Sequence, residues 1–146
     1  MFKRILVPVD GSPASRKAAK RAIAFAKAVG ASLTVYYAIP VVAPVFFGEG
    51  YAVPQSALDE IETAQRRTGE RYVGEVAKKA EKAGVQCTRV VNRAVPAAGI
   101  VATAQAQKCD VIFIGGHGWD ALKGLVLGSV TQRVLHDAKV PVLVYR

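Results

Sequence analysis

The chain has 146 residues, of which 51% are hydrophobic and 21% are charged, a composition typical of one globular domain and not of a disordered chain. No apolar run approaches the ~20 residues of a membrane span, and the basic start is too short for a signal peptide. The two cysteines, Cys87 and Cys109, have no metal-binding spacing, so we expect reduced thiols in a cytoplasmic protein.

The net charge of +9 results from 20 Lys and Arg residues against 11 Asp and Glu residues. Such an excess suits nucleic acid, an acidic membrane surface or an anionic small ligand. The basic residues are spread over two predicted helices, and acidic residues interleave with them in the second. No aromatic–basic alternation and no DNA-reading motif accompanies them, which favours a solvated basic surface and no specific nucleic-acid partner.

The first predicted strand covers residues 3–9, with Pro8 near its end, where a missing N–H matters least. Ser12 as N-cap and Pro13 at the first helical position predict a helix that stops at Gly30. Its predicted inward face consists of Ala18, Ala22, Phe25, Ala26 and Val29. A second strand is predicted at residues 32–38.

Residues 39–55 contain three prolines and two glycines and show no clear period, which predicts a segment without regular structure. The segment also carries Phe46, Phe47 and Tyr51. Three alternatives follow: a lid over a ligand, a patch for a protein partner, or a loop packed on its own domain.

A long helix is predicted from Ser56 to Gly84, with an inward stripe of Leu58, Ile61, Tyr72, Val76 and Ala80. The remaining predicted elements are a strand at 85–91, a helix from Pro96, a strand at 110–114, a helix from Ser129 with apolar spacing at Val130 and Val134, and a strand at 140–144. Alternating strands and helices predict an α/β fold: one doubly wound domain over residues 1–146, with a parallel sheet and helices on both faces. In such sheets ligands bind beyond the carboxyl ends of the strands.

The most informative motif is Gly115-Gly116-His117-Gly118, which follows a buried strand and precedes Gly128-Ser129 after nine further residues. Glycines at a strand end permit close backbone approach, and a helix that begins Gly-Ser offers N–H groups and a hydroxyl to an anion. The sequence therefore predicts a phosphate site. The alternative is a tight turn followed by an ordinary helix cap.

Asp10 ends the first strand, where it can accept from a ribose hydroxyl, hold a metal such as Mg²⁺, or cap the next helix. His117 can donate to a phosphate or be a surface residue. No second histidine, carboxylate pair or cysteine partner completes an acid–base or nucleophilic set, so no catalytic residue is predicted.

Residues 5–12 (ILVPVDGS), the spacing Gly115-x2-Gly118-x9-Gly128-Ser129, and residues 140–144 (VPVLV) together resemble the ATP-binding branch of the universal stress protein family. The resemblance covers essentially the whole chain. It implies a five-stranded parallel sheet of order 3-2-1-4-5. It also implies a homodimer that pairs through the last strand, between Pro141 and Tyr145.

The same resemblance implies the site residues. Asp10 would lie at the ribose, the backbone of Ala38 at the adenine, and Pro8 and Val9 along the pocket wall. The phosphate-binding residues would be Gly115, Gly118, Gly128 and Ser129, with His117 and Thr131 as additions.

The resulting hypothesis is a nucleotide-dependent stress-response and signalling module that binds ATP, with or without Mg²⁺, and hydrolyses it slowly at most. Its output would be a change in residues 39–55. The alternative is a partner-binding or chaperone-like stress protein that works without nucleotide. A phosphotransfer enzyme ranks third, because the chain displays neither a base nor a metal shell for it.

Overall fold

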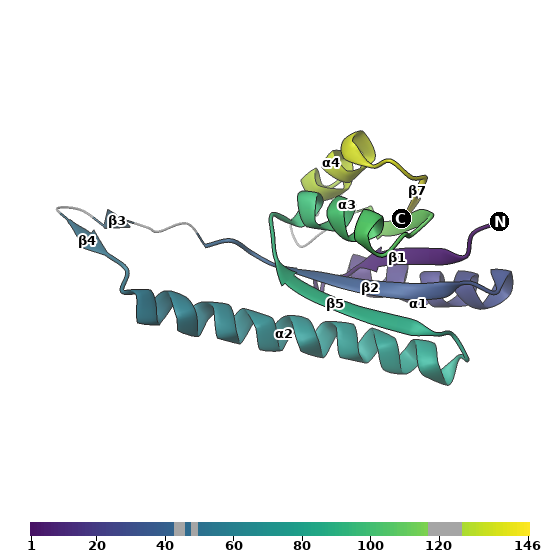
Figure 1. The fold of residues 1–146 in the computed structure, drawn as a ribbon, viewed down its shortest axis with the longest axis horizontal. Coiled ribbons are helices and arrows are strands. Elements are labelled where there is room, and N and C mark those ends of the chain that lie inside the picture. Colours follow the sequence, from purple (N-terminus) through teal and green to yellow (C-terminus); the bar gives the residue numbers. More distant parts are fainter. Residues whose placement is uncertain (43–45, 48–49, 117–126) are drawn as a thin grey trace.

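The centre of the molecule is a parallel sheet of five strands in the order β5-β2-β1-β6-β7 (Figure 1). The strands are β1 (Arg4–Pro8), β2 (Ser32–Ile39), β5 (Cys87–Arg93), β6 (Val111–Gly115) and β7 (Val142–Tyr145). Numbered along the chain within this sheet, the order is 3-2-1-4-5, which confirms the predicted topology. The computed structural model describes residues 1–42, 46–47, 50–116 and 127–146.

In the described part of the chain, helices cover both faces of the sheet (Figure 1). The helices are α1 (Pro13–Val29), α2 (Gln55–Lys82), α3 (Pro96–Ala106) and α4 (Ser129–Asp137). Helices α1 and α2 pack with the sheet in one apolar cluster, and α3 and α4 pack in a second cluster on the opposite face. Every residue of β6 is buried, as expected for a central strand covered on both sides.

Helix α1 begins and ends at the predicted residues. The Ser12 hydroxyl oxygen accepts a hydrogen bond from the Ser15 N–H at 3.1 Å, and Gly30 closes the helix in the left-handed conformation, at φ 69°. Ala18, Ala22 and Ala26 are buried as predicted, since small side chains bring the helix close to the sheet. Val29 is 41% exposed, so its predicted inward position is wrong.

Helix α2 has 28 residues, but its buried side chains begin only at Gly69. The predicted stripe is therefore confirmed at Val76 and Ala80 and wrong at Ile61, which is 40% exposed. A helix of this length spans about 42 Å and outruns the sheet. Despite its length, neither α2 nor any other helix in the described ranges is apolar enough to cross a membrane.

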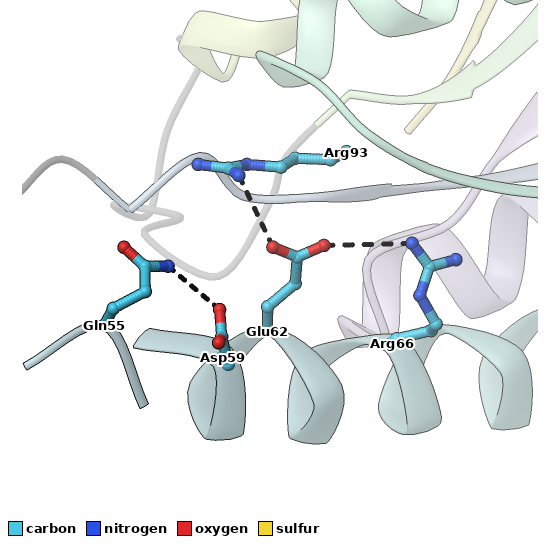
Figure 2. Close-up of polar contacts among 5 residues, drawn as sticks. All are labelled: Gln55, Asp59, Glu62, Arg66 and Arg93. Carbon is cyan, nitrogen blue, oxygen red and sulfur yellow. Dashed lines mark hydrogen bonds and ion pairs between the residues drawn. The ribbon is translucent and has the colours of Figure 1, made fainter. Parts of the chain in front are cut away.

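An ion pair links the first half of α2 to the end of β5. Figure 2 shows Arg93, at the end of β5, pointing toward Glu62 of α2, with an N–O distance of 3.4 Å. Glu62 also pairs with Arg66 at 3.9 Å, so one carboxylate lies between two guanidinium groups. One turn earlier, the Gln55 amide donates to Asp59 at 2.9 Å. These side chains are partly exposed, so the ion pairs add little stability.

Residues 39–55 contain more order than predicted. Two short strands, β3 (Phe46–Phe47) and β4 (Tyr51–Ala52), pair antiparallel. Figure 1 places this hairpin beyond the sheet, next to the start of α2. The expectation of no regular structure is therefore wrong within the described part of this segment.

Every strand of the main sheet differs from its predicted range by one or two residues at an end, and β5 and β7 each start two residues later than predicted. β5 starts at Cys87 and not at residue 85, because the Val85 N–H donates to the Ala80 oxygen at 2.9 Å and still belongs to the end of α2. β7 starts at Val142 and not at residue 140, after Pro141. Proline has no N–H to donate to a ladder, so it lies at the strand's edge.

Candidate functional site

The carboxyl ends of β1, β2 and β6 lie at one edge of the sheet, because these strands are parallel neighbours. Pro8 is the last residue of β1 and is buried. The Val9 N–H donates to the Tyr36 oxygen at 2.8 Å, which extends the β1–β2 ladder by one residue. Ala38, near the end of β2, is half-buried and lies opposite Asn92 of β5. The candidate wall residues therefore share this edge.

Asp10 lies in the turn between β1 and α1 and is exposed. Its Oδ1 accepts from the Ser12 N–H at 2.8 Å, and its own N–H donates to the Ser15 Oγ at 3.3 Å. The carboxylate thus has a structural role in the turn, but it does not cap the helix as the alternative predicted, because Ser12 is the N-cap. Its exposure also leaves it accessible to a ligand at the sheet edge.

Gly115 ends β6 in close contact with the first turn of α1. A Cβ at this position would lie 3.1 Å from the Ala14 oxygen and 3.4 Å from the Ser15 nitrogen. The close approach at this glycine is to the backbone of α1, whereas the sequence predicted an approach to a ligand. The contact holds the end of β6 beside the turn that carries Asp10.

The start of α4 is hydrogen-bonded to the end of β6. The Gly128 N–H donates to the Gly116 oxygen at 2.9 Å, and the buried Thr131 hydroxyl donates to the Gly115 oxygen at 2.8 Å. Gly128 is the N-cap, with φ −60° and ψ 152°, and no described side chain caps the helix. Ser129 is exposed at the first helical position. The N-terminal N–H groups and the positive end of the helix dipole therefore face the same edge as Asp10.

The structure brings together the described candidates in two linked groups. Pro8, Val9, Asp10 and Ala38 form the group at the carboxyl ends of β1 and β2. Gly115, Gly128, Ser129 and Thr131 form the group at β6 and α4, and the contact of Gly115 with α1 joins it to the Asp10 turn. The remaining predicted residues, His117 and Gly118, lie outside the described residues.

Two tyrosines that the sequence did not single out as site candidates lie near the Asp10 turn. The rings of Tyr37 and Tyr72 meet edge to face, with centroids 5.9 Å apart. Burial raises the pKa of Tyr37, and the nearby Tyr72 and Asp10 raise it further. Tyr72 was predicted only as part of a helix stripe, but its ring packs against Gly11 in the Asp10 turn. Tyr37 and Tyr72 are far apart in the sequence and meet only in the fold, so the sequence held no local signal for this pair.

Both cysteines are free thiols. Burial raises the pKa of both the Cys87 and the Cys109 thiols, so at neutral pH they are protonated and poor nucleophiles. No three His, Cys, Asp or Glu side chains among the described residues gather into a group that could hold a metal ion.

Comparison with known proteins points to one family along the whole chain. The model of the universal stress protein family matches residues 1–146. Universal stress protein MJ0531 of Methanocaldococcus jannaschii is 35% identical over 146 residues, which cover 100% of this chain and 83% of that protein. Universal stress protein YxiE of Bacillus subtilis is 32% identical over 149 residues, covering 100% of both chains.

Solved structures agree with this match. Universal stress protein UspA from Lactobacillus plantarum superimposes with a TM-score of 0.86 at 25% identity, over 99% of this chain and 98% of that one. Two more distant structures share the fold. One is a universal stress protein in complex with cAMP, with a TM-score of 0.68 at 23% identity over 99% and 97% of the two chains. The other is the Archaeoglobus fulgidus universal stress protein in complex with dAMP, with a TM-score of 0.64 at 18% identity over 100% and 98%.

Proposed function

The chain belongs to the universal stress protein family, and from this premise we propose that it binds ATP at the carboxyl edge of its sheet. Binding would make it a nucleotide-dependent stress-response and signalling module of the cytoplasm. The observation that carries the proposal is the start of α4. Its N–H groups have no described side-chain cap, and Thr131 and Gly128 hold it against β6 beside the Asp10 turn.

In the proposed complex the phosphates lie at the α4 N-terminus, near Gly115, Gly128 and Ser129. Helix N-termini bind phosphate because their N–H groups and dipole favour negative charge. Gly118 and His117 would complete the phosphate site. The two relatives solved with cAMP and dAMP support an adenine nucleotide as the ligand class.

The ribose and the adenine would lie along β1 and β2. Asp10 is exposed and can accept from a ribose hydroxyl, or help to bind a Mg²⁺ that accompanies the phosphates. The adenine would meet the backbone of Ala38, with Pro8 and Val9 along the wall. Asp10 would keep its bond to the Ser12 N–H, so the turn need not open for a ligand.

Signalling through the bound state fits this site better than rapid turnover. Among the described residues, the single histidine–carboxylate pair is that of His136 and Asp137, 2.6 Å apart. It lies at the C-terminal end of α4, away from the phosphates of the proposed complex. We therefore expect hydrolysis that is slow at most.

A nucleotide-independent, partner-binding role is the second candidate. It is favoured by the β3–β4 hairpin, which extends beyond the sheet and belongs to the segment predicted as a partner patch (Figure 1). The two candidates differ in one respect that can be measured in cells. If variants that do not bind ATP still support survival under stress, the second role is the correct one.

We also propose a homodimer that pairs through β7. This strand is at the edge of the sheet and pairs only with β6 in the described part of the chain. The Pro141 and Tyr145 oxygens accept from β6, so strand alternation turns the Val142 and Val144 N–H groups outward. A second β7 can bond to such an open edge. Val144→Pro should give a folded monomer in light scattering, whereas a dimer of unchanged mass would exclude this interface.

The proposal of ATP binding is tested by adding charge at the phosphate site. Ser129→Glu places a carboxylate at the α4 N-terminus, and we expect ATP affinity by calorimetry to fall about tenfold or more through like-charge repulsion. Leu135→Glu is the matched control, because Leu135 is 43% exposed on the same helix, away from its start. Equal affinities in both variants would argue against phosphates at this helix.

A further inference from the structure

A cavity of about 560 Å³ lies between α1 and α2. Each helix contributes residues at positions i, i+3, i+4 and i+7, which form one helical face. These residues are Arg16, Ala19, Lys20 and Ile23 of α1, and Tyr72, Glu75, Val76 and Lys79 of α2. The volume lies in the range of roughly 300–1,000 Å³ that is typical of small-molecule sites.

The inner surface of the cavity is mostly apolar, with the buried side chains of Val9, Ala19, Ile23 and Val76. Ser15 adds one buried hydroxyl, which donates to the Ser12 oxygen at 3.1 Å. Tyr72 lies at the end nearest the Asp10 turn, where its ring packs on Gly11. An apolar ligand body of about 10 Å could lie along the two helical turns from Arg16 to Ile23.

The rim of the cavity is basic. Four exposed cations, Arg16, Lys17, Lys20 and Lys79, line it against a single carboxylate, that of Glu75. None of the four forms an ion pair within the described ranges. Four cations from two helices therefore converge on one opening that holds one carboxylate, and this excess of positive charge raises the local attraction for an anion.

We propose that this cavity is a second ligand site, for a small organic anion with an apolar body and one acidic group. The apolar body would lie between the helices and the acidic group at the basic rim. A nucleotide fits this description poorly, because its several charges and polar sugar would face buried alkyl groups. The helix that we propose for nucleotide phosphates, α4, packs on the opposite face of the sheet. Val9, which we propose along the wall of the nucleotide site, also lines this cavity, so the two sites would adjoin at the end of β1.

Two fluorescent dyes of nearly equal shape test the charge requirement. Anilinonaphthalene sulfonate is an apolar anion, and phenyl-naphthylamine is its neutral counterpart. We expect the full chain to bind the sulfonate saturably, at one site per chain, and several-fold more tightly than the neutral dye. Equal affinity for both dyes, or fluorescence that never saturates, would overturn the proposal.

Charge-reversal variants locate the bound dye. Lys20→Glu with Lys79→Glu should weaken sulfonate binding about tenfold or more, since two rim cations become repulsive. The control is Lys27→Glu with Lys82→Glu. It makes the same change of net charge on the same two helices, outside the cavity lining. An equal loss in both pairs would mean that the dye responds only to overall charge, and the site would be rejected.

A filling variant tests the apolar interior. Ala19→Leu places a larger side chain in the buried wall and should weaken the binding of both dyes. Circular dichroism and thermal melting would check that the variant keeps its fold. If the variant is unstable, the conservative Val76→Ile provides the same readout. Displacement of the sulfonate by ATP, with no effect of the cavity variants, would instead place the dye in the nucleotide site and contradict the proposal.

Discussion

At the scale of single residues, the turn after β1 depends on Gly11. Its φ of 80° is in the left-handed region, and a Cβ would overlap the ring of Tyr72. Gly30 has a similar φ of 69° but no neighbour within 4 Å of a built Cβ. The two glycines thus share the backbone requirement and differ in their surroundings.

We predict that Gly30→Ala lowers the free energy of unfolding by about 1 kcal/mol, the cost of a left-handed alanine. Gly11→Ala should cost about 1–3 kcal/mol more, because Tyr72 must move. Urea denaturation measures both values. In the Tyr72→Leu background the extra cost of Gly11→Ala should shrink, and an unchanged cost would show that the Tyr72 contact is not its cause.

Thr131 was predicted as a phosphate ligand, and the structure gives its hydroxyl an internal partner, the Gly115 oxygen. Thr131→Val keeps the shape but leaves a buried carbonyl without this donor, so we expect a loss of about 1–3 kcal/mol in stability. Thr131→Ser keeps the hydroxyl and loses one methyl, and it should cost about 1 kcal/mol or less. Equal stability of the valine variant and the wild type in urea denaturation would contradict this role.

At the scale of elements, α2 consists of two unlike halves. Residues 69–82 pack on the sheet, whereas residues 55–68 contain no buried residue. Amide hydrogen exchange should therefore be faster in the first half, since few apolar contacts oppose local opening. Similar protection along the whole helix would contradict this prediction and indicate that a partner covers the first half.

The order and type of the main elements could be predicted because each carries a local signal. Ser12-Pro13 and Gly30 mark α1, and the apolar run after Asp110 marks β6. The extent of burial along a helix has no such signal. Val29 and Ile61 continue the apolar period of their helices, so periodicity predicts that both are buried. In the structure both side chains are exposed.

At the scale of the whole molecule, the candidate site arises from strands that are distant in sequence. Ligands bind at the carboxyl ends of parallel strands, and this rule correctly predicts that the Asp10 turn, Ala38 and Gly115 lie at the same end of the sheet. The packing that holds the edge together could not be predicted. Gly115 against Ala14 and Tyr72 against Gly11 are tertiary contacts, and neither has a pattern in the local sequence.

The most direct test of the central claim is a calorimetric titration of the emptied protein with ATP, with and without Mg²⁺. We predict one ATP per chain with micromolar affinity, and the release of nucleotide when freshly purified protein is denatured. Asp10→Asn keeps an oxygen acceptor for the Ser12 N–H, so the turn should survive while any contribution of Mg²⁺ to affinity falls. No released nucleotide and no heat of binding from the folded wild-type protein would contradict the proposed nucleotide site.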